Sequence, residues 1–250
     1  MDNLPALRAP DLGVEIDGLA YAAGRANGPF LRLVNRLGGG IEAQLDKLPL
    51  RLRADLERLT ARTLEMALDA ARVGSYAPDL GRRGSTFAAM ATGAAGGAAG
   101  LAGSLVELPV TVTIMLHAIR REAVAAGYDP DQEAIRLACL DVFSAGSPLR
   151  ADDGVNTAFL SARVAVAGPT LQRVIATVAP RLAVVLGEKL AAQAVPVLGA
   201  VTGAALNAAF ITYYREIARI RFRLMRLSEV HGTEAVMLAF AQAKVLPHRG

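Results

Sequence analysis

The stretch Gly84–Val106 reads GSTFAAMATGAAGGAAGLAGSLV and contains 23 residues without a charged side chain. Its glycines recur at the three- and four-residue steps that place side chains on one face of a helix. The pairs Gly93 with Gly97 and Gly96 with Gly100 form the small-xxx-small pattern, which lets two helix backbones approach closely. The stretch therefore predicts a helix that packs closely against another. The glycines expected at such contacts are Gly93, Gly96, Gly97, Gly100 and Gly103 here, and Gly199 and Gly203 in a second stretch.

That second stretch, Leu190–Tyr214, runs for 25 residues without a charge. A helix of about 20 residues crosses a hydrocarbon core, so each run is long enough to do so. In the first run, however, the strongly apolar side chains favour insertion by only about 2–3 kcal/mol in total, which Glu107 offsets. Pro196 and Asn207 weaken the second run. Three interpretations stay open: two buried helices of a soluble bundle, which we place first, peripheral or reversible membrane insertion, and a constitutive integral protein.

Composition favours helices. Hydrophobic residues make up 53% of the 250-residue chain and mean hydropathy is +0.34, but aromatics are only 5% and Trp is absent. Ala, Leu, Val and Gly must then supply the core, which suits closely spaced helices better than a sheet. We predict an all-α fold, a single multi-helix domain with two Gly/Ala-rich, closely packed helices. The net charge of +4 is small and scattered. It does not indicate nucleic acid, and a membrane surface or an acidic partner fits better.

The positions of glycine and proline divide the chain into three parts. We predict an irregular N-terminal arm over 1–28 with one short helix near 19–26, a helical domain over 29–240 and a C-terminal tail over 241–250. No apolar run of signal-peptide length opens the sequence, so we expect a cytoplasmic protein. Hydrophobic periodicity and Pro or Gly breaks predict the helices. Their expected ranges are 49–72, 84–108 with a kink or break at Pro109, 110–126, 132–143, 157–167, a helix to about 179 after a break at Gly168-Pro169, 180–194 and, at the C-terminal end of the second uncharged run, 213–227.

The last of these helices carries an arginine stripe. Arg215, Arg219, Arg223 and Arg226 recur at three- and four-residue steps, and apolar residues form a second stripe beside them. Such a helix could lie on anionic lipid or contact an acidic partner. It could equally be a surface helix of the bundle with a solvated arginine face.

Residues with catalytic chemistry are few. The chain has three histidines and one cysteine, and it lacks HExxH, HxH, CxxC and GxSxG patterns, so we expect no metal site and no cofactor. Cys139 lies in an apolar pattern typical of a core position. Glu107 is of more interest, because a carboxylate in an apolar run must find a partner or shift its pKa upward. An arginine of a neighbouring helix is the expected partner; a ligand or proton-linked role is the alternative.

Two blocks of the chain resemble a known family. The first is a glycine-rich helix followed by Glu107-Leu108-Pro109, Ile119-Arg120, Gly127-Tyr128-Asp129 and Glu133. The second contains Pro196–Ala200, Gly203-Ala204, Asn207, Ala218–Phe222 and His231-Gly232. Together they resemble the EcsC family. Glu107 stands where that family usually has an aspartate, which keeps the charge and lengthens the side chain.

The resemblance implies a bacterial, mainly helical protein of poorly defined activity, in a family whose namesake is associated by genetic neighbourhood with an ABC transporter. Some members have been labelled LasA-like peptidases. The sequence argues against that label, because a zinc peptidase of that kind needs an HxH pair among at least three ligands.

Three hypotheses follow. The first is a non-enzymatic protein at the inner face of the membrane, bound to lipid or to a membrane protein complex through its Gly/Ala helices and arginine stripe, as an accessory to a transporter or cell-envelope process. The second is an enzyme or small-molecule binder. The third is a homo-oligomer with a structural role. The polar residues that the resemblance brings forward as ligand or cluster candidates are Glu107, Arg120, Tyr128, Asp129, Glu133, Lys189 and Asn207.

Overall fold

The computed structural model describes residues 12–26, 50–73, 81–98, 100–147, 170–193 and 199–245, and every regular element in these ranges is a helix. The predicted all-α fold is confirmed. The elements are α1 (Leu12–Arg25), α4 (Leu50–Val73), α5 (Gly81–Ala98), α6 (Gly100–Ala125), α7 (Glu133–Asp141), a short 3-10 helix η2 (Val142–Ala145), α9 (Leu171–Gln193), α10 (Gly199–His231) and α11 (Thr233–Val245).

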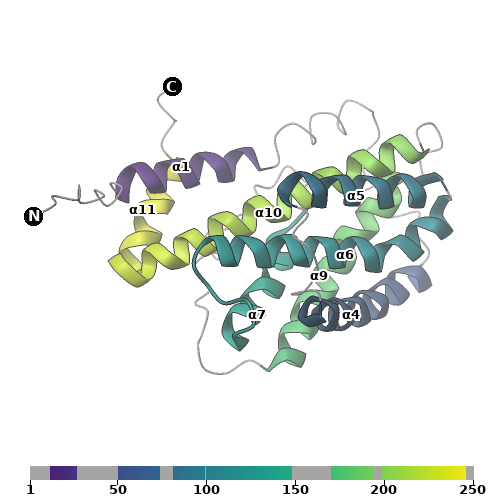
Figure 1. Cartoon of the computed structure of the whole chain (residues 1–250), viewed down its shortest axis with the longest axis horizontal. Coiled ribbons are helices and arrows are strands. Elements are labelled where there is room, and N and C mark those ends of the chain that lie inside the picture. Colours follow the sequence, from purple (N-terminus) through teal and green to yellow (C-terminus); the bar gives the residue numbers. More distant parts are fainter. Residues whose placement is uncertain are drawn as a thin grey trace, which may run out of the picture.

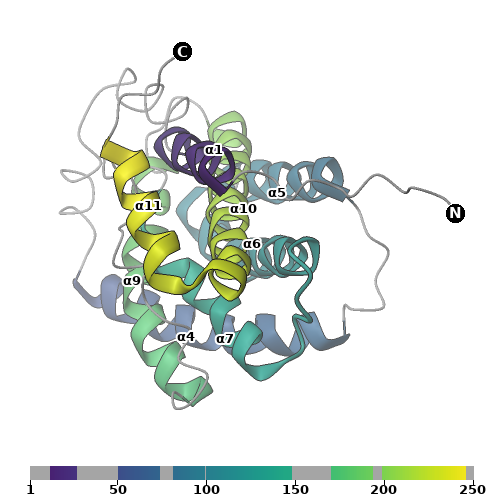
Figure 2. The ribbon, with the colours of Figure 1, turned by 90° about the vertical axis from the view of Figure 1, so that its left-hand side faces the viewer.

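The 33-residue helix α10 is the centre of the bundle (Figures 1 and 2). At 1.5 Å per residue it is about 50 Å long, so one half packs against α5 and α6 while the other reaches α1 and α11. Large side chains along its length, including Phe210, Tyr214 and Phe222, are fully buried. The arginine stripe and most of the second uncharged run therefore lie at opposite ends of the same helix, α10.

The first Gly/Ala run forms a helical hairpin instead of the single helix to Leu108 that we expected. Helix α5 ends at Ala98, α6 begins at Gly100, and the two pack side by side (Figure 1). Glycine lowers helix stability, so a run this rich in glycine is divided at little cost. The hairpin buries small residues of α5 against both α6 and α10. The second uncharged run is also divided, because α9 ends at Gln193 and α10 begins at Gly199.

Two prolines lie inside helices. Helix α6 continues through Pro109, so the alternative of a break there is wrong, and the predicted boundary at Pro180 is wrong as well. A proline in a helix interior removes one backbone hydrogen bond and costs about 3 kcal/mol. Buried side chains on both sides hold each helix in place against that cost, such as Leu108 and Val112 in α6. The carbonyl oxygen of Pro109 also accepts a hydrogen bond from Thr113 Oγ1 at 2.8 Å.

Other boundaries differ less. Helix α4 agrees with its predicted range within one residue at each end. Helix α7 begins at Glu133 with no side-chain cap at Gln132; Asp129 accepts a hydrogen bond from the Asp131 backbone N–H at 2.9 Å instead of capping the helix. The predicted helix over 157–167 and the Gly168-Pro169 break lie outside the described residues, as does Pro196.

The expected irregular arm contains the 14-residue helix α1, which is longer than the short helix predicted there. It packs against α11 and α10 with its buried face, and α11 itself continues to Val245, past the predicted boundary at 240. The apolar face of α1 explains this docking, because it presents side chains at helical spacing. The buried residues of that face are Ile16, Leu19, Ala20 and Ala23.

None of the helices in the described ranges has the combination of length and apolar character that a membrane-spanning segment needs.

The contact between α5 and α10 is close at Gly93. A Cβ atom at Gly93 would lie 2.7 Å from the carbonyl carbon of Gly203 and closer still to its oxygen. We predict that Gly93→Ala lowers the free energy of unfolding by about 1–3 kcal/mol, because the two helix backbones must move apart to make room for the methyl group. Urea denaturation measures the loss.

Gly18→Ala in α1 is the matched control. No atom lies within 4 Å of a Cβ built there, and alanine is favoured over glycine in a helix by about 1 kcal/mol. This variant should be as stable as the wild type or more so. Equal stability of the two variants would contradict the importance of the Gly93 contact.

Candidate functional site

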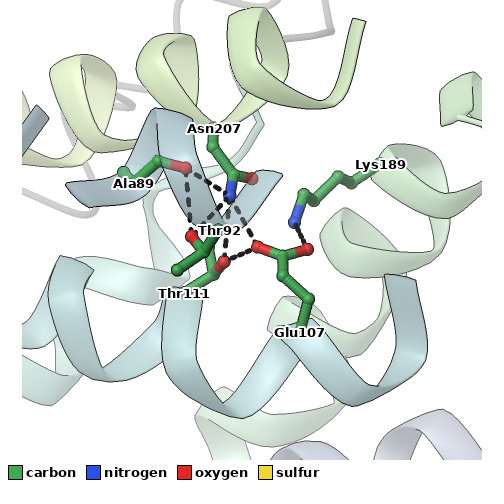
Figure 3. A network of polar contacts seen from close by, with 6 residues as sticks. All are labelled: Ala89, Thr92, Glu107, Thr111, Lys189 and Asn207. Carbon is green, nitrogen blue, oxygen red and sulfur yellow. Dashed lines mark hydrogen bonds and ion pairs between the residues drawn. The ribbon is translucent and has the colours of Figure 1, made fainter. Parts of the chain in front are cut away.

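A cluster of polar side chains lies in the interior where α5, α6, α9 and α10 meet (Figure 3). Lys189 of α9 donates a hydrogen bond from Nζ to Glu107 Oε2 of α6 at 2.7 Å. Asn207 of α10 donates from Nδ2 to the other carboxylate oxygen, Glu107 Oε1, at 2.5 Å, and Thr111 Oγ1 donates to that same oxygen. Lys189 and Asn207 are 0% exposed and Glu107 is 7% exposed. Three of the residues that the family resemblance brought forward thus meet at one point.

The amide of Asn207 also connects the cluster to α5. Its Nδ2 lies 2.8 Å from the carbonyl oxygen of Ala89, 3.3 Å from Thr92 Oγ1 and 3.1 Å from Thr111 Oγ1. An amide nitrogen has only two hydrogens, so these acceptors share them. The cluster therefore links four helices through one asparagine and one glutamate.

Two glycines of α5 provide the space for these side chains. A Cβ atom at Gly96 would lie 3.0 Å from Glu107 Cβ and 3.2 Å from Glu107 Oε2. A Cβ atom at Gly93 would lie 2.8 Å from Asn207 Cγ. Any larger residue at either position would therefore displace a member of the cluster.

Burial governs the electrostatics of the ion pair. Loss of solvent lowers the pKa of Lys189, and the adjacent Glu107 carboxylate opposes that shift. The expected arginine partner of Glu107 is wrong: the cation is a lysine, 82 positions further along the chain. Helix packing sets this pairing, because α9 brings Lys189 to the side of α6 on which Glu107 points inward (Figure 3).

The other polar candidates lie elsewhere. Arg120 is 13 residues after Glu107 on α6, about 20 Å along the helix axis. It ties down the turn before α7 with bonds to Asp131 Oδ1 at 2.8 Å and to the Pro130 carbonyl at 3.1 Å. Tyr128 donates from its hydroxyl to Glu229 Oε1 at 2.7 Å. Asp129 lies in that same turn and Glu133 is exposed in the first turn of α7.

The four arginines of the stripe have partners within the molecule. Arg215 is buried and donates to Ser85 Oγ at 2.8 Å and to Thr86 Oγ1 at 3.3 Å. The remaining three pair with carboxylates of α10 or α1. These pairs are Arg219 with Glu216, Arg223 with Glu15, and Arg226 with Glu229.

Sequence reasoning missed Ala89, Thr92 and Thr111 of the cluster. Thr111 carried a usable signal, because it lies four residues after Glu107 and so on the same helix face. Ala89 and Thr92 carried none, since their contact with Asn207 bridges more than 110 residues.

Two cavities at the surface lie apart from this cluster. One of about 360 Å³ is lined by residues of α1, α6 and α10, including Gly18, Glu122 and Arg219. Another of about 230 Å³ lies between α4, α7 and α9. Neither is lined by Glu107, Lys189 or Asn207. In the described ranges no three His, Cys, Asp or Glu side chains gather in one place. The cluster links four helices through buried hydrogen bonds and one ion pair.

The ion pair gives a stability prediction. Lys189→Met leaves a buried carboxylate without its cation and should lower the free energy of unfolding by about 3–5 kcal/mol. The double variant Glu107→Gln/Lys189→Met should recover much of that loss, because neither charge of this buried pair then remains. Urea unfolding of the single and double variants measures the difference. Arg58→Met, which removes one side of the exposed Arg58–Asp55 pair, is the control and should cost less than about 1 kcal/mol.

The single thiol gives another prediction. Cys139 is fully buried, and burial raises the pKa of its thiol to about 12. The native protein at pH 8 should therefore not react with a chromogenic disulfide reagent over minutes, because only the thiolate attacks. One thiol per chain should react at once in denaturant. Rapid labelling of the native protein would show that this core position opens.

No curated protein and no solved structure shows a significant match to the chain. The EcsC protein family, in contrast, matches residues 81–227, which includes α5, α6, α7, α9 and most of α10. Every residue of the buried polar cluster falls within that match. The chain belongs to the EcsC protein family.

Proposed function

We propose that this protein is a non-enzymatic member of the EcsC family that associates with a membrane surface through its α5–α6 hairpin. One observation supports the proposal above all others. Large apolar side chains on the hairpin are exposed to solvent: Phe87 is 73% exposed, Met90 39%, Val106 78% and Val110 48%. Small exposed residues continue the same surface. We call this surface the outer face of the hairpin, formed by Phe87, Met90, Ala91, Ala95 and Ala98 of α5 and by Val106 and Val110 of α6.

The outer face follows from how the hairpin packs. Helices α5 and α6 both lie beside α10 (Figure 2). Gly93, Gly96 and most of the polar cluster residues of the two helices are buried on that side. No charged residue occurs between Gly84 and Val106, and Glu107 is turned into the interior. The outward side is thus apolar by composition. Exposed apolar side chains grouped on one side of a helix pair are typical of interaction sites.

A lipid surface suits this face better than a specific protein partner does. The face offers methyl groups and one aromatic ring but no charged or amide side chain that would fix the orientation of a protein partner. Interfacial binding needs only an apolar face that enters the headgroup region by about 5–10 Å. Burial of a side chain such as phenylalanine contributes roughly 1.5–3 kcal/mol, so a few of them suffice for reversible association.

The proposal changes one part of the interpretation drawn from the sequence. The arginine stripe is not its basis, because Arg215 is buried and the other three arginines are paired with carboxylates. The outer face of the hairpin takes that place. A position at the inner face of the membrane, and a role beside a transporter or another envelope complex, remain proposals that rest on the family resemblance.

Sedimentation with liposomes tests the proposal. Wild-type protein should pellet with the vesicles, and Phe87→Ser/Val106→Ser should bind at least about tenfold more weakly, because two apolar side chains are lost from the contact. Val230→Ser/Leu238→Ser removes equally exposed side chains at a distance from the hairpin and should bind like the wild type.

A second double variant distinguishes binding by the outer face from binding by the arginine stripe. Arg219→Glu/Arg223→Glu should leave binding by the outer face intact, whereas loss of binding would favour the arginine stripe. Wild-type protein that stays in the supernatant with every lipid mixture would overturn the membrane proposal. A concentration-dependent increase in mass under those conditions would favour a second copy of the chain as the partner.

A further inference from the structure

We infer that the hairpin meets an anionic membrane at a tilt, with the end near Ala98 and Val106 inserted and the end near Arg83 at the level of the lipid phosphates. The inference rests on the proposed function and adds to it the class of lipid and the orientation. It follows from the register of α5 against α6 and from the basic residues that lie beyond one end of the uncharged outer face.

Contacts within the polar cluster fix the register. Gly96 lies against Glu107, and Thr92 lies near Thr111 because both touch the amide of Asn207. The second pair is four residues earlier on α5 and four residues later on α6, which is the pattern of antiparallel helices. By the same register Phe87 is level with residue 116, and Arg83 is level with residues 120 and 121.

The surface of the hairpin therefore changes character from the outer face to the residues beyond its Phe87 end. Near the turn of the hairpin it carries Ala95, Ala98, Val106 and Val110 and no charge. Two to four turns further along α6, the same helix face carries His117 and then Arg121, beside the exposed Arg83 of α5. About 22 Å separates Val106 from Arg121 along the helix axis. The outer face is apolar, and the surface beyond its Phe87 end is basic.

These two surfaces match the two layers of a lipid monolayer. About 15 Å along α6 separates Val106 from the level of Phe87, so in a tilted hairpin Val106 lies deeper than Phe87 within the roughly 5–10 Å that an interfacial helix enters. Arginine side chains at the edge of an apolar surface extend toward phosphate while their methylene groups stay in contact with apolar atoms. A guanidinium also forms two parallel hydrogen bonds with a phosphate. Arg83 is thus placed to select vesicles that carry anionic headgroups.

Single tryptophans measure the tilt, because the chain contains none of its own. Val106→Trp and Phe87→Trp report the two ends of the outer face. Leu238→Trp on α11 is the control, because α11 lies on the opposite side of the bundle (Figure 2). With vesicles that contain phosphatidylglycerol and lipids brominated at stated depths, the tryptophan at 106 should be quenched best by deep bromines and the one at 87 by shallow bromines. The control should not change.

Charge reversal tests the lipid class. Each unit of positive charge near the surface strengthens binding about fivefold. Arg83→Glu changes the charge by two units, so it should weaken binding to phosphatidylglycerol vesicles by about 30-fold. Arg226→Glu changes the net charge equally at a distant exposed site and should change binding much less. Far-UV circular dichroism before each titration verifies that these surface variants are folded.

The outcomes separate the inference from the function on which it rests. Equal depth for the tryptophans at 87 and 106, or equal effects of Arg83→Glu and Arg226→Glu, would overturn the tilted, anion-selective contact while the membrane association stands. If neither tryptophan of the hairpin responds to any vesicle, both the inference and the proposed function fail.

Discussion

The close approach of α5 to α10 at Gly93 and Gly203 is the constraint on which the rest of the structure depends. With no Cβ at Gly93, the two backbones come near enough for the amide of Asn207 to reach the carbonyl oxygen of Ala89. The same amide then holds one oxygen of Glu107, whose other oxygen holds Lys189. The missing side chain at Gly93 thus allows hydrogen bonds that connect four helices. The polar cluster would have no place in a bundle whose helices stood further apart.

The sequence predicted the parts of the fold that depend on local patterns. Low aromatic content with abundant Ala, Leu and Gly indicated helices, and the apolar period of 49–72 gave α4 within one residue at each end. Local rules failed where tertiary packing overrides them. Pro109 and Pro180 interrupt hydrogen bonding in any isolated helix, yet buried side chains on both sides keep α6 and α9 continuous. The division between α5 and α6 had no marker, because Gly and Ala occur uniformly across it.

For the candidate site, the sequence indicated that Glu107 needs a partner but not which one. That choice depends on α9, whose packing against α6 places a lysine and not an arginine beside the carboxylate. The seven polar candidates separate into the cluster around Glu107 and a second group near the turn before α7, since α6 holds Glu107 and Arg120 far apart. A run without charges also does not reveal which of its residues face the core. The exposure of Phe87 and Val106 therefore became clear only from the packing of the hairpin.

The pairing of α1 with α11 and α10 has a consequence for biosynthesis. The ribosome releases α1 early, but its docking surface includes α11 and the arginine of α10 that pairs with Glu15, 208 positions later. Until those residues have left the exit tunnel, the apolar face of α1 has no native surface to cover it. Ile16 and Leu19 therefore lack their native cover until α10 and α11 have been synthesised. Docking of α1 can only follow the synthesis of these two helices.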